Sequence, residues 1–312
     1  MIRKWAGQLT SIAVTLVLVL SLVFIGMRLL PGDAASLRAG TEASDAQVTA
    51  IRDSLGLAVP WLSQFATYWQ GLARGDLGTS FREQRPVTKI VAERLPVTIQ
   101  LALCSLTLTL LLGLGLGMIA GLNPGHVVER VVLAATTLGL TLPGFWLGFL
   151  LLLLFAVQRD WFPLIGFDTT GGTLARLHAL TLPALTLAIP NAAQLARLTR
   201  AEVLELRHAD FIRTARSKGL ARGAVIQHIT ANALPKVLPL VALTLGGLLT
   251  GTIVVEQVFG LPGLGLAMLG AIAARDYPVV QGITIVVVLV YITVNALADA
   301  LQVLSDPRLR YG

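Results

Sequence analysis

The chain has 312 residues, of which 55% are hydrophobic and 13% are charged, and its mean hydropathy is +0.76. Soluble domains carry about 25% charged residues, so this composition excludes an ordinary soluble fold and indicates a membrane protein. The net charge of +7 does not indicate a nucleic-acid partner, because no basic patch interleaved with aromatic residues is present. The single cysteine, Cys104, lies in an apolar run, which excludes a disulfide framework.

Apolar stretches long enough to cross a bilayer recur along the chain. A membrane-spanning helix needs about 20 mostly apolar residues. Six stretches meet this requirement, and the apolar part of each is free of formal charge. They are residues 9–30, 97–122, 131–157, 179–196, 237–255 and 277–298. Alternating segments of the β-barrel type are absent, so the predicted fold is all-α and integral to the membrane.

The basic residues predict which side of the membrane each segment faces. An even number of spans places both termini on one side. Lys and Arg are frequent in residues 1–8, 197–236 and 305–312, whereas the two short loops on the opposite side hold few. The positive-inside rule therefore predicts cytoplasmic termini and a cytoplasmic segment 197–236. The first span is expected to be uncleaved, because its apolar run exceeds the roughly 7–15 residues of a signal peptide.

The long outer segment, residues 31–96, is amphipathic rather than of low complexity. Trp61 and Phe65 are four residues apart, and Tyr68 and Trp69 follow. This spacing predicts a helix that lies at the membrane surface with an aromatic belt. Either a structural lid or a substrate gate fits such a segment.

Glycine and proline positions predict how the spans pack and bend. Gly113, Gly117 and Gly121 recur every four residues in the second span, a pattern that allows close approach of another helix. Pro143 and Pro190 predict kinks in the third and fourth spans. Residues 257–274 are uncharged but broken by glycines and a proline, which predicts a short re-entrant or surface piece on the outer side.

Few polar side chains are candidates for the translocation path. Asn191 follows Pro190 inside the fourth span, where either a path role or simple packing is open. Glu256 and Asp276 flank the outer ends of the last two spans. They are expected at edges where solvation is cheap, and either line the path or mark a boundary.

No motif of an enzyme is present. The sequence has no GxSxG, HExxH or CxxC motif, no GxxxxGK[ST] phosphate loop, and no metal-ligand spacing among its histidines. Catalytic residues, a metal site and nucleotide binding are therefore not expected. A self-contained secondary transporter is the alternative class, but it should show internal repeats and charges within spans, and the sequence shows neither.

The central segment 197–236 carries a helical pattern at residues 202–218. Phe211, Ala215 and Gly219 fall on one face at four-residue spacing, and Gly219 stands where the helix should end. A second helical stretch is predicted at residues 221–229. The pattern fits a compact cytoplasmic knob made of two helices, and a solvated basic loop that only sets topology is the alternative.

The stretch FIRTARSKGL, followed by HITANALPKVLP, resembles the cytoplasmic EAA loop of permeases from binding-protein-dependent ABC importers. Arg213-Thr214-Ala215 takes the place of the Glu-Ala-Ala triplet, Gly219 is the glycine, and Ile229 follows after nine residues. The missing glutamate matches the peptide and nickel branch of that family.

Further stretches resemble the same branch in order along nearly the whole chain. They are Leu30-Pro31-Gly32-Asp33, Gly75-Asp76-Leu77-Gly78-Thr79-Ser80, Val254-Val255-Glu256, Pro262-Gly263-Leu264-Gly265, Arg275-Asp276-Tyr277-Pro278 and Asp306-Pro307-Arg308. The long first outer segment is similar to that of the B-type permease subunit in dipeptide, oligopeptide and nickel systems. Ala34 departs from the family, which usually has proline there.

The resemblance implies a type I ABC importer permease in the bacterial inner membrane. It implies a second homologous permease of the C type, two ATPase subunits that use ATP and Mg, and an extracytoplasmic binding protein, with no cofactor bound by this chain. Dipeptides or oligopeptides are the implied cargo, and a nickel chelate or glutathione is the alternative. The residues implied to contact the ATPase are Phe211, Arg213, Thr214, Ala215, Arg216, Lys218, Gly219 and Leu220.

Overall fold

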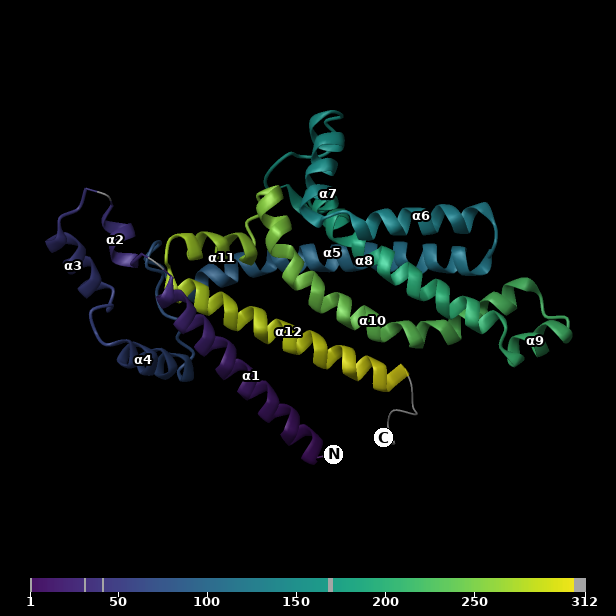
Figure 1. Ribbon diagram of the computed structural model, residues 1–312, viewed down its shortest axis with the longest axis horizontal. Coiled ribbons are helices and arrows are strands. Elements are labelled where there is room, and N and C mark those ends of the chain that lie inside the picture. The colour runs from purple at the N-terminus through teal and green to yellow at the C-terminus, as the bar shows by residue number, and fades with distance from the viewer. Residues whose placement is uncertain (1, 31, 41, 168–170, 306–312) are drawn as a thin grey trace. The chain divides into compact units, whose positions relative to one another are not determined.

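A computed structural model describes residues 2–30, 32–40, 42–167 and 171–305 (Figure 1). The described chain is helical, apart from loops and one isolated β-bridge between Thr79 and Pro86. It divides into two compact units. The first contains residues up to 97 together with 263–292, and the second contains residues 98–262 together with those from 293 onward.

The first unit is built from short helices beside parts of longer ones. Its elements are α1 (Ile2–Leu29), α2 (Ala34–Ala39), α3 (Asp45–Ser54), α4 (Trp61–Ala73), the beginning of α5 (Val87–Leu122), α11 (Leu264–Ala273) and most of α12 (Tyr277–Ser305). Short helices need local start signals, and α3 has a capping box in which Ser44 and Gln47 exchange hydrogen bonds. The Asp33 side chain caps α2 in the same way, by accepting a bond from the Ala35 N–H.

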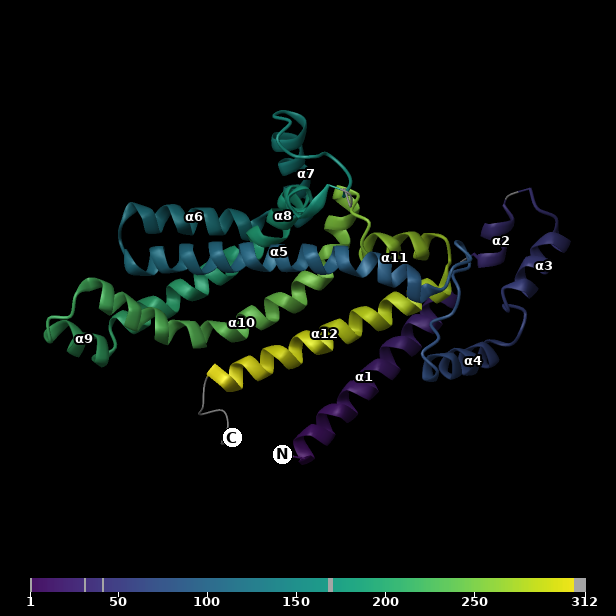
Figure 2. The ribbon, with the colours of Figure 1, turned by 180° about the vertical axis from the view of Figure 1, so that it is seen from behind.

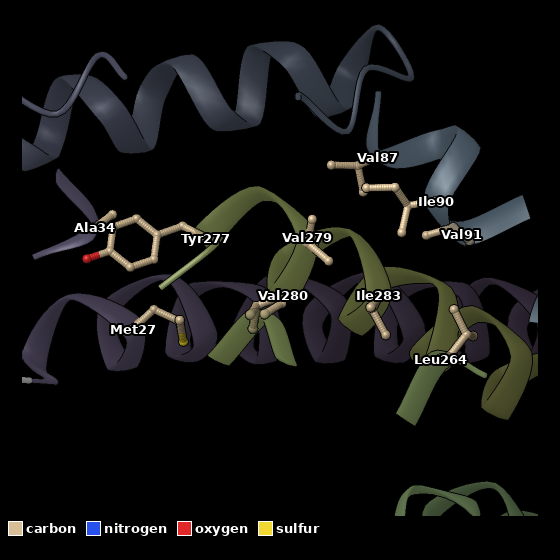
Figure 3. Packing of buried hydrophobic residues seen from close by; sticks show 11 residues of the cluster. Met27, Ala34, Val87, Ile90, Val91, Leu264, Tyr277, Val279, Val280 and Ile283 are labelled. Carbon is tan, nitrogen blue, oxygen red and sulfur yellow. The ribbon is translucent and has the colours of Figure 1, made fainter. Parts of the chain in front are cut away.

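The core of the first unit lies where α12 begins and contacts α5 (Figure 3). Val279, Val280 and Ile283 of α12 are buried together with Val87 and Ile90 of α5. The approach of the two helices is close, because a Cβ added at Gly282 would lie 2.4 Å from the Cγ1 of Val87. Burial of this branched apolar face holds the unit together.

The predicted aromatic helix of the outer segment is present as α4. The Phe65 ring packs edge-on against Phe24 of α1, with ring centroids 4.9 Å apart, so α4 is attached to the end of α1. Burial raises the pKa of the Tyr68 hydroxyl to about 12. Trp61 stays 56% exposed. The helix is thus amphipathic, as the sequence predicted, and its position at the membrane surface stays a prediction.

The second unit is organised around α8 (Figure 2). Its elements are the rest of α5, α6 (Val127–Thr141), α7 (Gly144–Leu151), a π-helical segment η1 (Leu152–Val157), α8 (Gly172–Arg207), α9 (Asp210–Ser217) and α10 (Arg222–Phe259). Helix α8 packs against α6, α7 and α10. Four helices of the described residues are long and apolar enough to cross a bilayer by themselves, or up to six if each of two bent pairs forms one span.

The glycine face predicted in the second span is confirmed. A Cβ added at Gly117 would lie 2.5 Å from the Cβ of Thr199, and the side chains of Leu195 and Val203 stand equally close to Gly113 and Gly121. These distances are below normal van der Waals contact. Helices α5 and α8 can therefore approach this closely only because the three positions on α5 are glycines.

The third span is not the continuous helix that the sequence predicted for residues 131–157. Helices α6 and α7 are bent by 108° at Pro143. Proline removes a backbone N–H and clashes with the preceding turn, so the helix ends at Thr141 and a new one begins at Gly144. The predicted kink was therefore placed correctly, but its size was underestimated.

The helices on either side of the central segment are longer than the predicted spans. Helix α8 continues to Arg207, and α10 already begins at Arg222. The helix predicted over residues 202–218 is broken, because α8 ends before His208 and α9 begins at Asp210. Residues 197–236 are thus the ends of two long helices with a short helix between them. Further on, α10 ends at Gly260 with a φ of 61°, so residues 257–274 are not one helix.

Candidate functional site

Helix α9 is the short element that joins α8 to α10, and both neighbours contact it (Figure 1). Its end is defined by Gly219, whose φ is 77°. The Leu220 N–H donates to the Ala215 carbonyl at 3.2 Å, and the Gly219 N–H donates to the Arg216 carbonyl at 2.9 Å. This pair of bonds is a Schellman motif, which ends a helix on a left-handed residue. Gly219 therefore ends α9, as the sequence predicted.

The inner side of α9 is attached through one side chain. Ile212 is fully buried, and it lies in a cluster with Leu206 of α8 and Val225 and Ile229 of α10. Full burial of an isoleucine contributes about 1.5–3 kcal/mol. The cluster therefore ties α9 to both long helices at once. We call it the α9 anchor, and its buried members are Val203, Leu206, Ile212, Val225, Ile229 and Ala233.

Polar contacts fix the same region. The Arg207 Nη1 donates to the carbonyls of Gly121 and Leu122 at 3.0 and 3.1 Å, so the last residue of α8 caps the end of α5. The Lys236 ammonium of α10 lies 2.9 Å from Glu202 and 3.1 Å from Glu205. The hydrogen bonds that the Lys236 ammonium donates, to Glu202 first and to Glu205, raise the pKa of Lys236.

The outer side of α9 is free of internal packing. The Phe211 side chain is 45% exposed, and Arg213, Thr214 and Arg216 are exposed too, whereas Ala215 is partly buried. The contact between Asp210 and Arg213, at 3.5 Å, joins two strongly exposed side chains and contributes little. An exposed phenylalanine among arginines is suited to contact another protein.

The backbone conformation explains why glycine occupies position 219. A Cβ at this position would meet open space, whereas the positive φ favours glycine by itself. Its role within the chain is therefore to turn the backbone from α9 into α10.

The two carboxylates at the ends of the last spans are buried, contrary to the prediction of cheap solvation. Glu256 is 0% exposed, and its Oε1 accepts a hydrogen bond from the Thr98 hydroxyl at 2.6 Å. Asp276 is 2% exposed, and it accepts bonds from the Ser80 hydroxyl at 2.5 Å and from the backbone N–H groups of Phe81 and Arg82. Donors replace the lost water in each case.

The remaining path candidate, Asn191, is partly buried on α8, and its Nδ2 donates to the Leu187 carbonyl at 2.7 Å. This hydrogen bond is made within α8, to the backbone of the same helix. Among the described residues, no group of three or more His, Cys, Asp or Glu side chains could hold a metal ion.

Sequence reasoning missed the contacts that join different helices. Besides the Lys236 bridge, the Arg200 guanidinium of α8 pairs with Glu129 of α6 at 2.5 Å. The sequence pattern of residues 202–218 does not single out Ile212. The feature that could have identified Ile212 is that it is an aliphatic residue among charged ones, which suits the inner side of an amphipathic helix.

Several helices of bilayer length, with a short polar helix between two long ones, define an integral membrane protein. Comparison with known proteins shows the family. Residues 113–311 match the family described as the inner membrane component of binding-protein-dependent transport systems, and residues 1–102 match its N-terminal family. The chain belongs to this family, and it is a multi-pass permease of an ABC importer in the inner membrane.

Individual relatives agree with this assignment. The chain is 41% identical over 298 residues to a protein of Brucella abortus (strain 2308) named as a peptide transport system permease, with 95% of each chain covered. It is 38% identical over 312 residues to the glutathione transport system permease protein of Pectobacterium atrosepticum, with 100% of each covered. The resemblance to B-type peptide permeases is thereby confirmed.

Solved structures confirm the fold. The MetNI methionine ABC transporter in inward-facing conformations matches with a TM-score of 0.58 and 17% identity, covering 70% of this chain and 97% of that one. An amino acid ABC transporter matches with a TM-score of 0.53 and 18% identity, covering 69% of this chain and 94% of the other. At such identities the likeness concerns the fold alone.

Proposed function

We propose that this permease carries short peptides into the cell, together with a second homologous permease. The observation that carries this proposal is the likeness over at least 95% of the chain to relatives named for peptide and for glutathione transport. Glutathione is itself a peptide and is the alternative cargo. A nickel chelate, which the sequence left open, has no support among these relatives.

We further propose that the importer contains two separate ATPase subunits, one of which binds at α9 of this chain, that both termini lie on the same cytoplasmic side, and that a binding protein delivers the substrate on the other side. ATP is then hydrolysed by the partners, and this chain has no catalytic role. The proposed contact residues lie on α9 and the turn after it, and all but the partly buried Ala215 are exposed: Phe211, Arg213, Thr214, Ala215, Arg216, Lys218, Gly219 and Leu220.

The contacts around α9 explain how such docking would move the spans. The α9 anchor binds the short helix to α8 and α10, and the Lys236 bridge holds those two helices together. A displacement of α9 would therefore reach both long helices without being absorbed in a loose loop. Closure of the ATPases shifts the permease only to the extent that they bind one arrangement of α8 and α10 better than the other.

The path residues stay proposals. Asn191 and Glu256 are the candidates, and Glu256 is covered by Thr98 in the arrangement described here. A path role for Glu256 requires an arrangement in which this hydrogen bond opens, whereas Asn191 is already partly exposed.

Co-purification tests the proposed function. The tagged chain is extracted in mild detergent with its native partners, and ATP hydrolysis is measured with the binding protein loaded with dipeptides, longer peptides or glutathione. We expect a second permease and ATPase subunits to co-purify, with hydrolysis stimulated by a peptide. Stimulation by glutathione alone would select the alternative cargo. Recovery of this chain without ATPase subunits, under conditions that preserve another ABC importer, would contradict the proposal.

Substitution at Gly219 tests the docking site. Gly219→Trp should insert, because an added Cβ meets nothing within 4 Å, but it should reduce recovery of the ATPase subunits at least about tenfold by blocking the docked surface. Gly219→Ala is the matched control, since it carries the same strain of a positive φ but adds no bulk. Recovery and transport at the wild-type level by the Trp variant would rule out docking at this turn.

A further inference from the structure

A basic hollow lies where α5 ends and where α9 and α10 meet. Its volume is about 430 Å³, within the range of roughly 300–1,000 Å³ that is typical of small-ligand sites. Its polar lining is Arg207, Arg216 and Arg222, and its apolar lining is Leu122, Leu220, Val225, Ile226 and Ile229. All of these residues belong to the second unit.

The three arginines come from three different helices, and no carboxylate lines the hollow. Arg207 is held by the two carbonyls at the end of α5, which fixes its guanidinium in place. In the part of the chain that the structure describes, neither Arg216 nor Arg222 lies within ion-pair distance of an acidic side chain. Three neighbouring guanidinium groups repel one another, so an anion between them would be bound favourably.

The start of α10 adds to this positive field. Its N-cap residue is Ala221, which has no side chain that could accept hydrogen bonds from the first N–H groups. The N-terminus of a long helix carries a partial positive charge and binds phosphate and carboxylate groups readily. Among anions, phosphate suits several guanidinium groups best. Each guanidinium group presents parallel N–H donors that match two oxygens of the phosphate.

The apolar side of the hollow decides which phosphate it is suited to. Leu122 is the last residue of the long apolar helix α5, and Val225 and Ile229 belong to the α9 anchor. The hollow therefore sets guanidinium groups beside apolar side chains, as a lipid sets its phosphate beside its hydrocarbon. We propose that this hollow binds the phosphate headgroup of an anionic phospholipid. Such a site goes beyond transport and does not depend on the cargo, but it shares Arg216 and Leu220 with the proposed ATPase contact, so the test below must separate the two.

Binding of short-chain lipids tests the site. The tagged full chain, with all subunits that co-purify, is titrated with dioctanoyl phosphatidylglycerol, with dioctanoyl phosphatidylcholine and with inorganic phosphate, and bound molecules are counted by native mass spectrometry. R216Q/R222Q removes two charges from the hollow. The matched control R213Q/K218Q removes two charges from the same segment, and neither residue lines the hollow.

We expect the wild type and the control to bind phosphatidylglycerol alike, and phosphatidylcholine weakly. R216Q/R222Q should bind phosphatidylglycerol at least about tenfold more weakly, since each basic residue near a lipid surface contributes on the order of 1 kcal/mol, which is about fivefold. Equal binding by both double variants would overturn the proposal. Displacement of the lipid by an equal concentration of inorganic phosphate would assign the site to the free anion instead.

A third result would assign the arginines to a protein partner. If R216Q/R222Q kept its lipid but lost the ATPase subunits, the hollow would hold an acidic side chain of the partner, and the lipid site would be wrong. Conversely, arginine-dependent lipid binding by a chain that recovers no ATPase would support the lipid site while the proposed function failed. The two proposals are therefore separable in one experiment.

Discussion

Gly117→Ala is expected to lower the thermal stability of the permease strongly. The new methyl group would lie 2.5 Å from the Cβ of Thr199 and 2.7 Å from the Ala196 carbonyl oxygen. Neither atom is the flexible end of a side chain, so α5 and α8 must move apart along their contact. Overpacking of this kind costs about 1–3 kcal/mol, and the separation also weakens the neighbouring contacts of Gly113 and Gly121. The midpoint of thermal unfolding in mild detergent should fall accordingly.

Gly115→Ala is the matched control for this prediction. Gly115 lies on the same helix, yet a Cβ there would meet nothing within 4 Å. Alanine is the better helix former by about 1 kcal/mol, so this variant should keep the wild-type midpoint or raise it slightly. Equal midpoints for the two variants would show that the close contact of α5 and α8 does not stabilise the protein.

The glycine face could be predicted from sequence because it is a local pattern. Four-residue spacing on a helix places side chains on one face whatever the rest of the fold does, and only small residues allow close packing there. The partner helix could not be predicted, because Leu195, Thr199 and Val203 carry no mark that pairs them with glycines far away in the chain. Local periodicity therefore predicts the glycine face, whereas the helix that packs against this face is determined by tertiary packing.

The burial of the two carboxylates, in contrast, could not be predicted from the sequence. Glu256 and Asp276 stand at the ends of apolar runs, which in sequence alone resemble solvated boundaries. Their donors are Thr98, far away in the chain, and the loop at Ser80 to Arg82. A buried carboxyl group is stable only where such donors surround it, and no pattern within its own segment reveals them.

For the sharp bend at Pro143, the sequence predicts the position but not the size, since proline marks the position of a break but not its angle.

For the candidate site, the outer face was predictable and the inner attachment was not. The family pattern around Gly219 predicts the docking residues, and most of them are exposed on α9 and the turn after it. The attachment of that helix to α8 and α10 depends on Ile212, which no motif singles out. Helix α9 has only 8 residues. Isolated helices shorter than about 12–15 residues are marginal in water, so α9 depends on its anchor to hold its shape and position.

Ile212→Ala is therefore expected to uncouple ATP hydrolysis from transport. Removing a fully buried isoleucine side chain costs about 2–5 kcal/mol of packing, and here that loss falls on the attachment of α9 to α8 and α10. The exposed docking residues are unchanged, so the ATPase subunits should still bind. In proteoliposomes containing the assembled importer, the number of peptides carried per ATP hydrolysed should fall at least about tenfold.

Ile283→Ala separates this effect from general destabilisation. Ile283 is 1% exposed and lies on α12, outside the α9 anchor, so the same truncation is made without touching α9. It should lower the yield of assembled importer while leaving the peptides carried per ATP close to the wild type. If the two variants lost coupling equally, the loss would come from general destabilisation and not from the attachment of α9. Unchanged coupling in Ile212→Ala would mean that α9 moves the spans through its chain connections alone, and the α9 anchor would have no part in transport.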